Sequence, residues 1–142
     1  MIQYIKELSD FGLLILIWLV QLIIYPSFTY MNNENLLSWH PKYTTMISVV
    51  VMPLMLIQLF STFYLTYNDF NLILLIQCIL IILLWTTTFF QAVPLHNQIE
   101  TANEMQTAAT KLVQINWRRT IMWTFIVILN FIGRIDNIKH YM

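Results

Sequence analysis

The sequence predicts an all-α integral membrane protein, a four-helix bundle with a short interfacial helix between its third and fourth helices. Of its 142 residues, 58% are hydrophobic and only 10% are charged, against roughly 25% charged in a soluble domain. Long charge-free runs also recur along the chain. A helix needs about 20 residues to cross about 30 Å of hydrocarbon, and the runs have lengths near this value. Residues 1–142 are therefore predicted to form one transmembrane domain.

Charged residues bound each predicted helix. The first three charge-free runs cover residues 11–33, 43–68 and 70–95, and the short connection between the second and third requires an antiparallel hairpin. The fourth run, residues 120–133, has 14 residues between two arginines, or about 21 Å of helix. It must extend upstream through Leu112, which draws the arginines toward the membrane interface. The predicted helices cover about residues 9–30, 41–67, 70–94 and 112–134.

Prolines and polar connections refine these boundaries. Pro41 is a favoured first helical residue, so His40 is expected near the N-cap of the second helix. Pro53 is expected to kink that helix, and Pro94 to bend or end the third. The polar segment 98–114 has a loosely helical pattern, which predicts the interfacial helix that caps one mouth of the bundle.

Positive charges barely distinguish the two membrane faces. The face with both termini carries Lys6, Arg134 and Lys139. The other face carries Lys42, Lys111, Arg118 and Arg119. If Arg118 or Arg119 belongs to a ligand site and is left out of the count, the two faces become equal or the face with the termini carries more basic residues. Because basic residues prefer the cytoplasmic side of a membrane, we expect both termini in the cytoplasm. We expect a protein of the bacterial inner membrane, surrounded by membrane lipids, with His140 solvated in the C-terminal tail.

Several function classes are excluded by what the sequence lacks. Seven basic residues balance seven acidic ones, which leaves no basic surface to bind a nucleic acid. The sequence has no Gly-rich phosphate loop and no Cys-x-x-Cys or His-Glu-x-x-His motif. We also expect no carboxylate in the cores of the four helices, which disfavours a proton-coupled transporter.

Polar and aromatic residues recur at spacings of three and four within the helices, which marks the faces turned toward other helices. Such stripes form interhelical hydrogen bonds in any bundle, but here they are concentrated near one membrane face and predict a ligand site. The candidate ligand-binding residues are Gln21, Tyr25, Trp39, Tyr43, Trp85, Gln91, Asn116 and Trp123. Of these, Trp39 fits an interfacial anchor better than a ligand contact.

Three residues near that face are candidate catalytic groups. His40 or His96 would act as a ligand or a general base, and Arg119 would bind a carboxylate or stabilise an oxyanion. Glu100 follows His96 by four residues, so His40, His96 and Glu100 resemble a two-histidine, one-carboxylate metal set. Two histidines could also ligate a haem iron. The pattern leaves haem, a metal ion and no cofactor as open alternatives.

The motif Pro94-Leu95-His96-Asn97, followed by Leu112-Val113-x-x-Asn116-Trp117-x-Arg119-Thr120, resembles small bacterial four-helix membrane proteins of uncharacterised function. It is more remotely similar to the anthrone-oxygenase-like membrane family, where a proline ends helix three and a Trp/Arg signature opens helix four. The resemblance implies an enzyme that oxidises a flat aromatic or polyketide-like substrate, with or without a cofactor. The two histidines, His40 and His96, and the element Trp39-His40-Pro41 have no match in that family.

These observations predict a membrane-embedded oxidoreductase or binding protein for a lipophilic ring-shaped ligand, such as a quinone, a haem or a polyketide. The alternative is a non-catalytic subunit or assembly factor of a larger membrane complex, or a homo-oligomer, for which small size and scattered interhelical polar groups are typical. A transporter or channel ranks last, because the helix cores are expected to hold no carboxylate. Four short helices also leave little room for alternating access.

Overall fold

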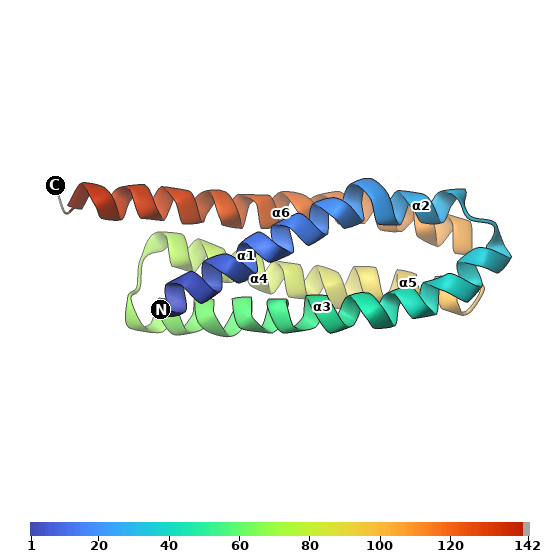
Figure 1. Ribbon diagram of the computed structural model, residues 1–142, viewed down its shortest axis with the longest axis horizontal. Coiled ribbons are helices and arrows are strands. Elements are labelled where there is room, and N and C mark those ends of the chain that lie inside the picture. Colours follow the sequence, from blue (N-terminus) through green and yellow to red (C-terminus); the bar gives the residue numbers. More distant parts are fainter. Residues whose placement is uncertain (141–142) are drawn as a thin grey trace.

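A computed structural model describes the backbone of residues 1–140 and the side chains of residues 1–135. Four long helices pack side by side in an elongated bundle (Figure 1). The expectations for Lys139 and His140 lie outside the described side chains.

Two of the four long helices contain a wider, π-helical turn. The first consists of α1 (Ile2–Leu19), the π segment η1 (Val20–Ile24) and α2 (Tyr25–Tyr30), and the second is α3 (Asn33–Asn68). The third consists of α4 (Leu72–Thr87), the π segment η2 (Thr88–Ala92) and α5 (Val93–Glu100), and the fourth is α6 (Met105–His140). The chain begins, and α6 ends, near the α3–α4 connection, which we call the termini end. The α2–α3 and α5–α6 connections form the opposite, far end (Figure 1).

The second long helix begins earlier than predicted. Asn32 caps it, since its side-chain oxygen accepts a hydrogen bond from the backbone N–H of Asn35 at 2.8 Å. Glu34 lies in the first turn, where a negative charge interacts favourably with the helix dipole. The prediction that His40 sits near the N-cap is therefore wrong. His40 and Pro41 lie inside α3, about two turns beyond its start.

Residues 98–114 also differ from the prediction, because they do not form a separate interfacial helix. The last turn of α5 continues to Glu100, a short turn places Ala102 and Glu104 at positive φ (57° and 47°), and α6 begins at Met105. Ala109 and Leu112 are fully buried. Their apolar stripe is continuous with the buried face of the rest of α6, so packing favours one unbroken helix through this region.

Pro94 does not end the third long helix. Proline lacks a backbone N–H, and its ring clashes with the carbonyl four residues earlier in an α-helix. In both the first and third long helices a π segment lies directly before the turn that contains the proline, Pro26 after η1 and Pro94 after η2. The wider turn accommodates the ring, and the helix continues. Pro41 and Pro53 are instead tolerated inside α3.

Two groups of buried side chains hold the helices together. Near the far end, Phe28, Leu36 and Ile99 are completely buried, and Ala108 lets the start of α6 approach its neighbours closely. In the middle of the bundle, α1, α3, α4 and α6 bury a second group: Leu13, Ile17, Met55, Ile81, Leu84, Trp123 and Ile126. Burial of these groups turns the remaining apolar side chains outward.

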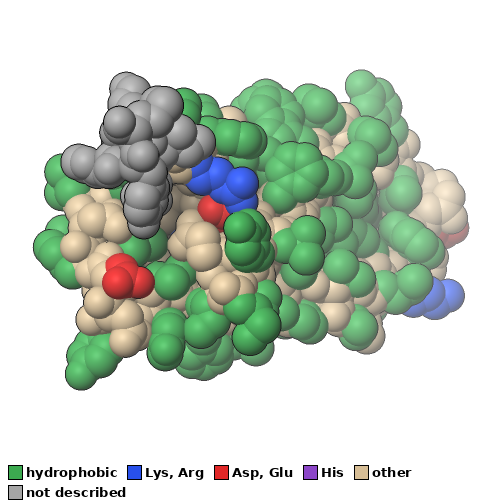
Figure 2. Space-filling model, turned by 60° about the vertical axis from the view of Figure 1, so that its left-hand side comes forward, with side chains coloured by type: hydrophobic (Ala, Val, Ile, Leu, Met, Phe, Trp, Pro, Cys, Tyr) green, Lys and Arg blue, Asp and Glu red, His purple; other side chains and the backbone are tan. Residues whose placement is uncertain are grey.

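The outer surface is rich in large apolar side chains. Figure 2 shows a face on which hydrophobic side chains predominate and charged ones are few. Within the described residues, three helices are long and apolar enough to cross a membrane: Ile2–Tyr30, Asn33–Asn68 and Leu72–Glu100. The fourth, α6, is not among them. Residues 120–133 of this helix carry no charge, but charged residues precede and follow them, with Lys111, Arg118 and Arg119 on one side and Arg134 on the other.

Candidate functional site

A cavity of about 440 Å³ lies inside the bundle, between the first long helix, α3, the η2–α5 region and α6. Most of its wall is apolar. Five ionisable side chains also line it, Tyr25, Tyr43, His96, Glu100 and Arg119, together with smaller polar side chains such as those of Thr44 and Ser48. The cavity therefore joins an apolar chamber to a group of ionisable and hydrogen-bonding side chains.

Both π segments contribute to this cavity. Val20 of η1 and Thr88, Phe89 and Ala92 of η2 line its wall. Tyr25 directly follows η1. The π segments therefore lie where the helices must widen around the cavity, a position in which π turns are often functional.

A line of polar groups runs from the cavity wall at Tyr25 through two histidines to Glu100. The Tyr25 hydroxyl lies 3.0 Å from Nε2 of His96, and Nδ1 of His96 lies 2.8 Å from Nε2 of His40. On the other side of the His40 ring, Nδ1 faces Oε1 of Glu100 at 3.3 Å, a longer and less well aligned contact. Thr44 donates a hydrogen bond to the same Glu100 oxygen at 2.9 Å. These contacts connect the cavity wall with Glu100, whose side chain reaches the surface of the bundle.

Aromatic rings enclose this line of groups. The ring of Phe28 packs edge-on against His40, with centroids 5.3 Å apart, and against Tyr43 at 5.2 Å. Phe28 and His40 are both completely buried. Apolar packing therefore covers His40, while Glu100, which is one-third exposed, reaches the surface.

Arg119 is a buried cation at the cavity wall. It is only 7% exposed, and its guanidinium lies over the Trp123 ring, 5.4 Å from the centroid. Nη1 donates to Oδ1 of Asn116 at 3.1 Å, while Nε is buried without a hydrogen-bond partner. Asn116 in turn donates to Gln21 at 3.0 Å. Among the described residues, none of the carboxylates forms an ion pair with Arg119.

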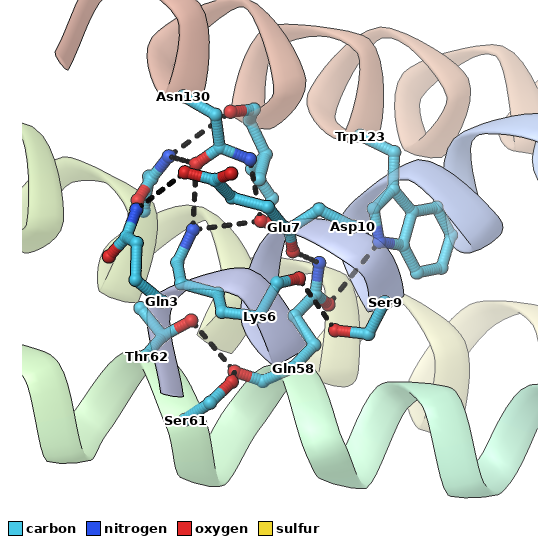
Figure 3. A network of polar contacts seen from close by, with 12 residues as sticks. Gln3, Lys6, Glu7, Ser9, Asp10, Gln58, Ser61, Thr62, Trp123 and Asn130 are labelled. Carbon is cyan, nitrogen blue, oxygen red and sulfur yellow. Dashed lines mark hydrogen bonds and ion pairs between the residues drawn. The ribbon is translucent and has the colours of Figure 1, made fainter. Parts of the chain in front are cut away.

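A second polar cluster, which the sequence analysis missed, lies toward the termini end (Figure 3). Lys6 and Asp10 are both fully buried and form an ion pair at 2.8 Å. Asn130 donates to Asp10 and accepts from Lys6, both at 2.8 Å. Gln58 donates to the other Asp10 oxygen at 2.7 Å, and Gln77 donates to Asn130 at 2.8 Å. This cluster cross-links all four long helices.

The Asp10 cluster corrects the expectation that the helix cores hold no carboxylate. That expectation treated Asp10 as the boundary before the first apolar run. The spacing of four residues between Lys6 and Asp10 was the available signal, because it allows an ion pair on one helix face. The cluster also reaches the cavity, since the Trp123 indole donates to Gln58 at 3.3 Å.

The structure brings many of the predicted site residues together. Tyr25, Tyr43, His96, Arg119 and Trp123 line the cavity, together with Glu100. Three more lie behind the cavity wall. His40 contacts His96 there. Asn116 accepts a hydrogen bond from Arg119 and donates one to Gln21.

The remaining three predicted residues do not line the cavity. Trp39 is 44% exposed on the outside of α3. Trp85 stacks against Phe89, with centroids 5.5 Å apart. Gln91 lies half-buried within η2. Arg118, next to Arg119, points outward and is exposed.

The geometry bears on the metal and haem alternatives. His40 faces His96 with one ring nitrogen and Glu100 with the other, so the three groups surround no common point. Within the described part of the chain, no group of three His, Cys, Asp or Glu side chains is placed to hold a metal ion. The 2.8 Å contact between His40 and His96 leaves no room for an iron between those two nitrogens.

No protein-family model, no curated protein and no solved structure matches this chain. The resemblance of residues 94–120 to the anthrone-oxygenase-like family stays a prediction.

Proposed function

We propose that the protein is a membrane-embedded binding protein or oxidoreductase for a lipophilic, ring-shaped compound that carries an anionic or strongly polar oxygen. Hydroxyquinones and polyketide-like phenols are ligands of this class. One observation carries the proposal: Arg119 is buried without a carboxylate partner at the wall of a mainly apolar cavity.

Electrostatics argues for an oxygen of the ligand at Arg119. A charge buried in a medium of low dielectric constant costs several kcal/mol unless a partner offsets it. Among the described residues, the guanidinium donates one hydrogen bond, to Asn116, and its Nε has no acceptor. An oxygen anion in the cavity would accept from the remaining donors, whose planar arrangement suits bidentate contacts.

The size and lining of the cavity support a ring-shaped ligand. A volume of about 440 Å³ lies within the usual range of small-molecule sites, about 300–1,000 Å³. Trp123, Tyr25 and Tyr43 supply flat aromatic surface, and Ile17 and Met55 fill the apolar wall. A ring with one polar edge toward Arg119 fits this distribution of side chains.

The route into the cavity favours a ligand dissolved in the membrane. On the α3 side the lining includes Thr45 and Ser48, and on the η2 side Phe89, all of which are exposed on the outer surface. These residues lie within two of the apolar helices that are long enough to span a membrane. A lipophilic compound would then enter sideways from the hydrocarbon.

The first prediction tests the role of Arg119. Lawsone, a hydroxynaphthoquinone that is anionic at neutral pH, and menadione, its neutral methyl counterpart, are titrated against detergent-purified protein, with quenching of tryptophan fluorescence as the readout. We expect lawsone to bind more tightly. Arg119→Gln should weaken lawsone binding by about tenfold to a hundredfold, the usual loss for a charge-assisted hydrogen bond of about 1.5–3 kcal/mol, and leave menadione binding nearly unchanged.

Arg118→Gln is the matched control, because Arg118 is the adjacent arginine but is exposed. Equal losses in the two variants would contradict a specific role for Arg119. Binding of neither quinone, together with copurification of a partner protein, would favour the alternative of a non-catalytic subunit in a larger membrane complex.

A further inference from the structure

We propose that Tyr25, His96, His40 and Glu100 form a proton-transfer path that carries the proton of an acidic ligand from the cavity to the far end of the bundle. The inference rests on the proposed binding function and adds the fate of the ligand's proton. Three elements, α2, α3 and α5, supply the four groups. The first two contacts are hydrogen bonds of 3.0 and 2.8 Å. The third, from His40 to Glu100, is a less well aligned contact of 3.3 Å.

The donors and acceptors of the path can point in one consistent direction. An ionised Glu100 only accepts hydrogen bonds, so Nδ1 of His40 carries the proton that faces it, and Nε2 of His40 accepts. It accepts from Nδ1–H of His96, whose Nε2 then accepts from the Tyr25 hydroxyl. Both histidines are therefore neutral Nδ1–H tautomers, and the buried site needs no imidazolium ion.

The transfer moves one proton, and no electrons leave or enter the ligand. The acidic O–H bond of the ligand breaks, and its proton joins the Tyr25 oxygen as Tyr25 passes its own proton to Nε2 of His96. His96 passes its Nδ1 proton to His40, and His40 passes its Nδ1 proton to Glu100. The ligand is left as an anion beside Arg119, both rings become Nε2–H tautomers, and Glu100 becomes a neutral acid.

The surroundings favour this direction of transfer. Arg119 from α6 stabilises the ligand anion, and Tyr43 from α3 is the other ionisable group close to the path, with its ring 6.4 Å from that of His96. Phe28 covers His40. Glu100 is the member of the path that reaches the surface, with a side chain that is 33% exposed, so it can release the proton to water.

A ligand-free measurement tests the direction of the hydrogen bonds. Nitrogen NMR of histidine-labelled protein in micelles distinguishes the two neutral tautomers, and substitutions of single histidines assign the signals. We expect Nδ1–H on both His40 and His96. We also expect Glu100→Gln to shift the His96 signals, although of the two histidines the Glu100 carboxylate faces only His40, because the effect passes along the line of polar contacts.

Glu104→Gln is the matched control, since Glu104 lies at the same end of the bundle and is exposed. It should leave the His96 signals in place. Opposite tautomers on the two rings would put two donors or two acceptors between them and would overturn the proposal, whether or not any ligand binds.

A second measurement tests the transfer itself. Naphthol, a lipophilic ring with one weakly acidic hydroxyl, is mixed rapidly with the protein in weak buffer that contains a pH indicator. Tryptophan quenching reports binding, and the indicator reports the released proton. Glu100→Gln should delay proton release by about a hundredfold after the ligand has bound, a typical contribution of a general acid or base. The quenching signal from the same samples separates this delay from any change in binding. Added acetate should restore part of the rate.

The two possible failures of this experiment are distinguishable. Unchanged proton release in Glu100→Gln, with binding intact, would overturn the path and leave the binding function standing. Absence of naphthol and lawsone binding in the unaltered protein would instead contradict the binding function, and the NMR measurement would still decide the hydrogen-bonded path.

Discussion

At the scale of single residues, helical spacing separated inward from outward side chains better than residue type did. Arg118 and Arg119 are adjacent and chemically identical, yet the first is exposed and the second buried. Their different positions on the helix face were visible in the sequence, because neighbours in an α-helix point about 100° apart. The partners of each side chain were not visible, because they lie on other helices.

The buried pair of Lys6 and Asp10 leads to a prediction about stability. Asp10→Ala should lower the free energy of unfolding by about 3–5 kcal/mol, because it leaves the buried Lys6 without its ion-pair partner. The measurement is unfolding in mixed micelles with increasing fractions of a denaturing detergent. Asp69→Asn, which changes an exposed aspartate in the α3–α4 connection, serves as the control and should change stability little.

A double variant distinguishes an unpaired charge from lost packing. Lys6→Met combined with Asp10→Leu removes both charges and keeps much of the volume. It should recover most of the stability lost in Asp10→Ala, since replacing a whole buried ion pair by apolar groups is often neutral. Failure of the double variant to recover stability would show that the amides of Gln58 and Asn130 depend on the carboxylate.

At the scale of elements, the apolar runs predicted four helices, but the ends of those helices depended on capping and on proline. Asn32 and Asn71 accept hydrogen bonds from the backbone three residues ahead and start α3 and α4. The π segments η1 and η2 let the helices continue past Pro26 and Pro94. The length and composition of an apolar run do not reveal a π turn. Such a turn forms only where the neighbouring helices leave room for the wider backbone.

Deletion of one residue tests the role of η2. A π turn holds about one residue more than an α turn, so deleting Phe90, which is 80% exposed, should convert η2 into an α-helix with both flanks in register. We expect the melting temperature to change by less than about 5 °C, and lawsone binding to be lost because η2 no longer widens around the cavity. Circular dichroism during heating gives the melting temperature.

Deletion of Ile82 is the control for this prediction. Ile82 is also exposed, but it lies in the regular helix α4. Its loss should rotate one half of the third long helix by about 100° against the other, turn buried residues such as Ile81 outward and lower the melting temperature by about 10 °C or more. Equal tolerance of both deletions would argue against a specific role for the π turn.

At the scale of the whole molecule, the start of the chain, the end of α6 and the α3–α4 connection lie together at the termini end (Figure 1). Lys6 and Arg119 are buried, so neither contributes to the count of basic residues on the two predicted membrane faces. The remaining described side chains still give no strong asymmetry, and the cytoplasmic position of the termini stays a prediction.

Cysteine labelling in membrane vesicles tests the topology. In a Cys78→Ala background, Asp69→Cys places a thiol at the termini end and Asn103→Cys at the far end, both in connections between helices. A membrane-impermeant maleimide should label the two from opposite sides, with position 69 on the cytoplasmic side. Labelling of both positions from one side would contradict a bundle that spans the membrane.

The sequence by itself determined the helical class, the number of long helices and the inward side of most polar residues. These features follow from composition and from periodicity within one helix. Tertiary structure decided which distant residues meet: it placed Tyr25, His40 and His96 in one line, left Arg119 without a carboxylate and buried Asp10 with Lys6. Such contacts depend on the axial register and rotation of packed helices, which no single helix encodes.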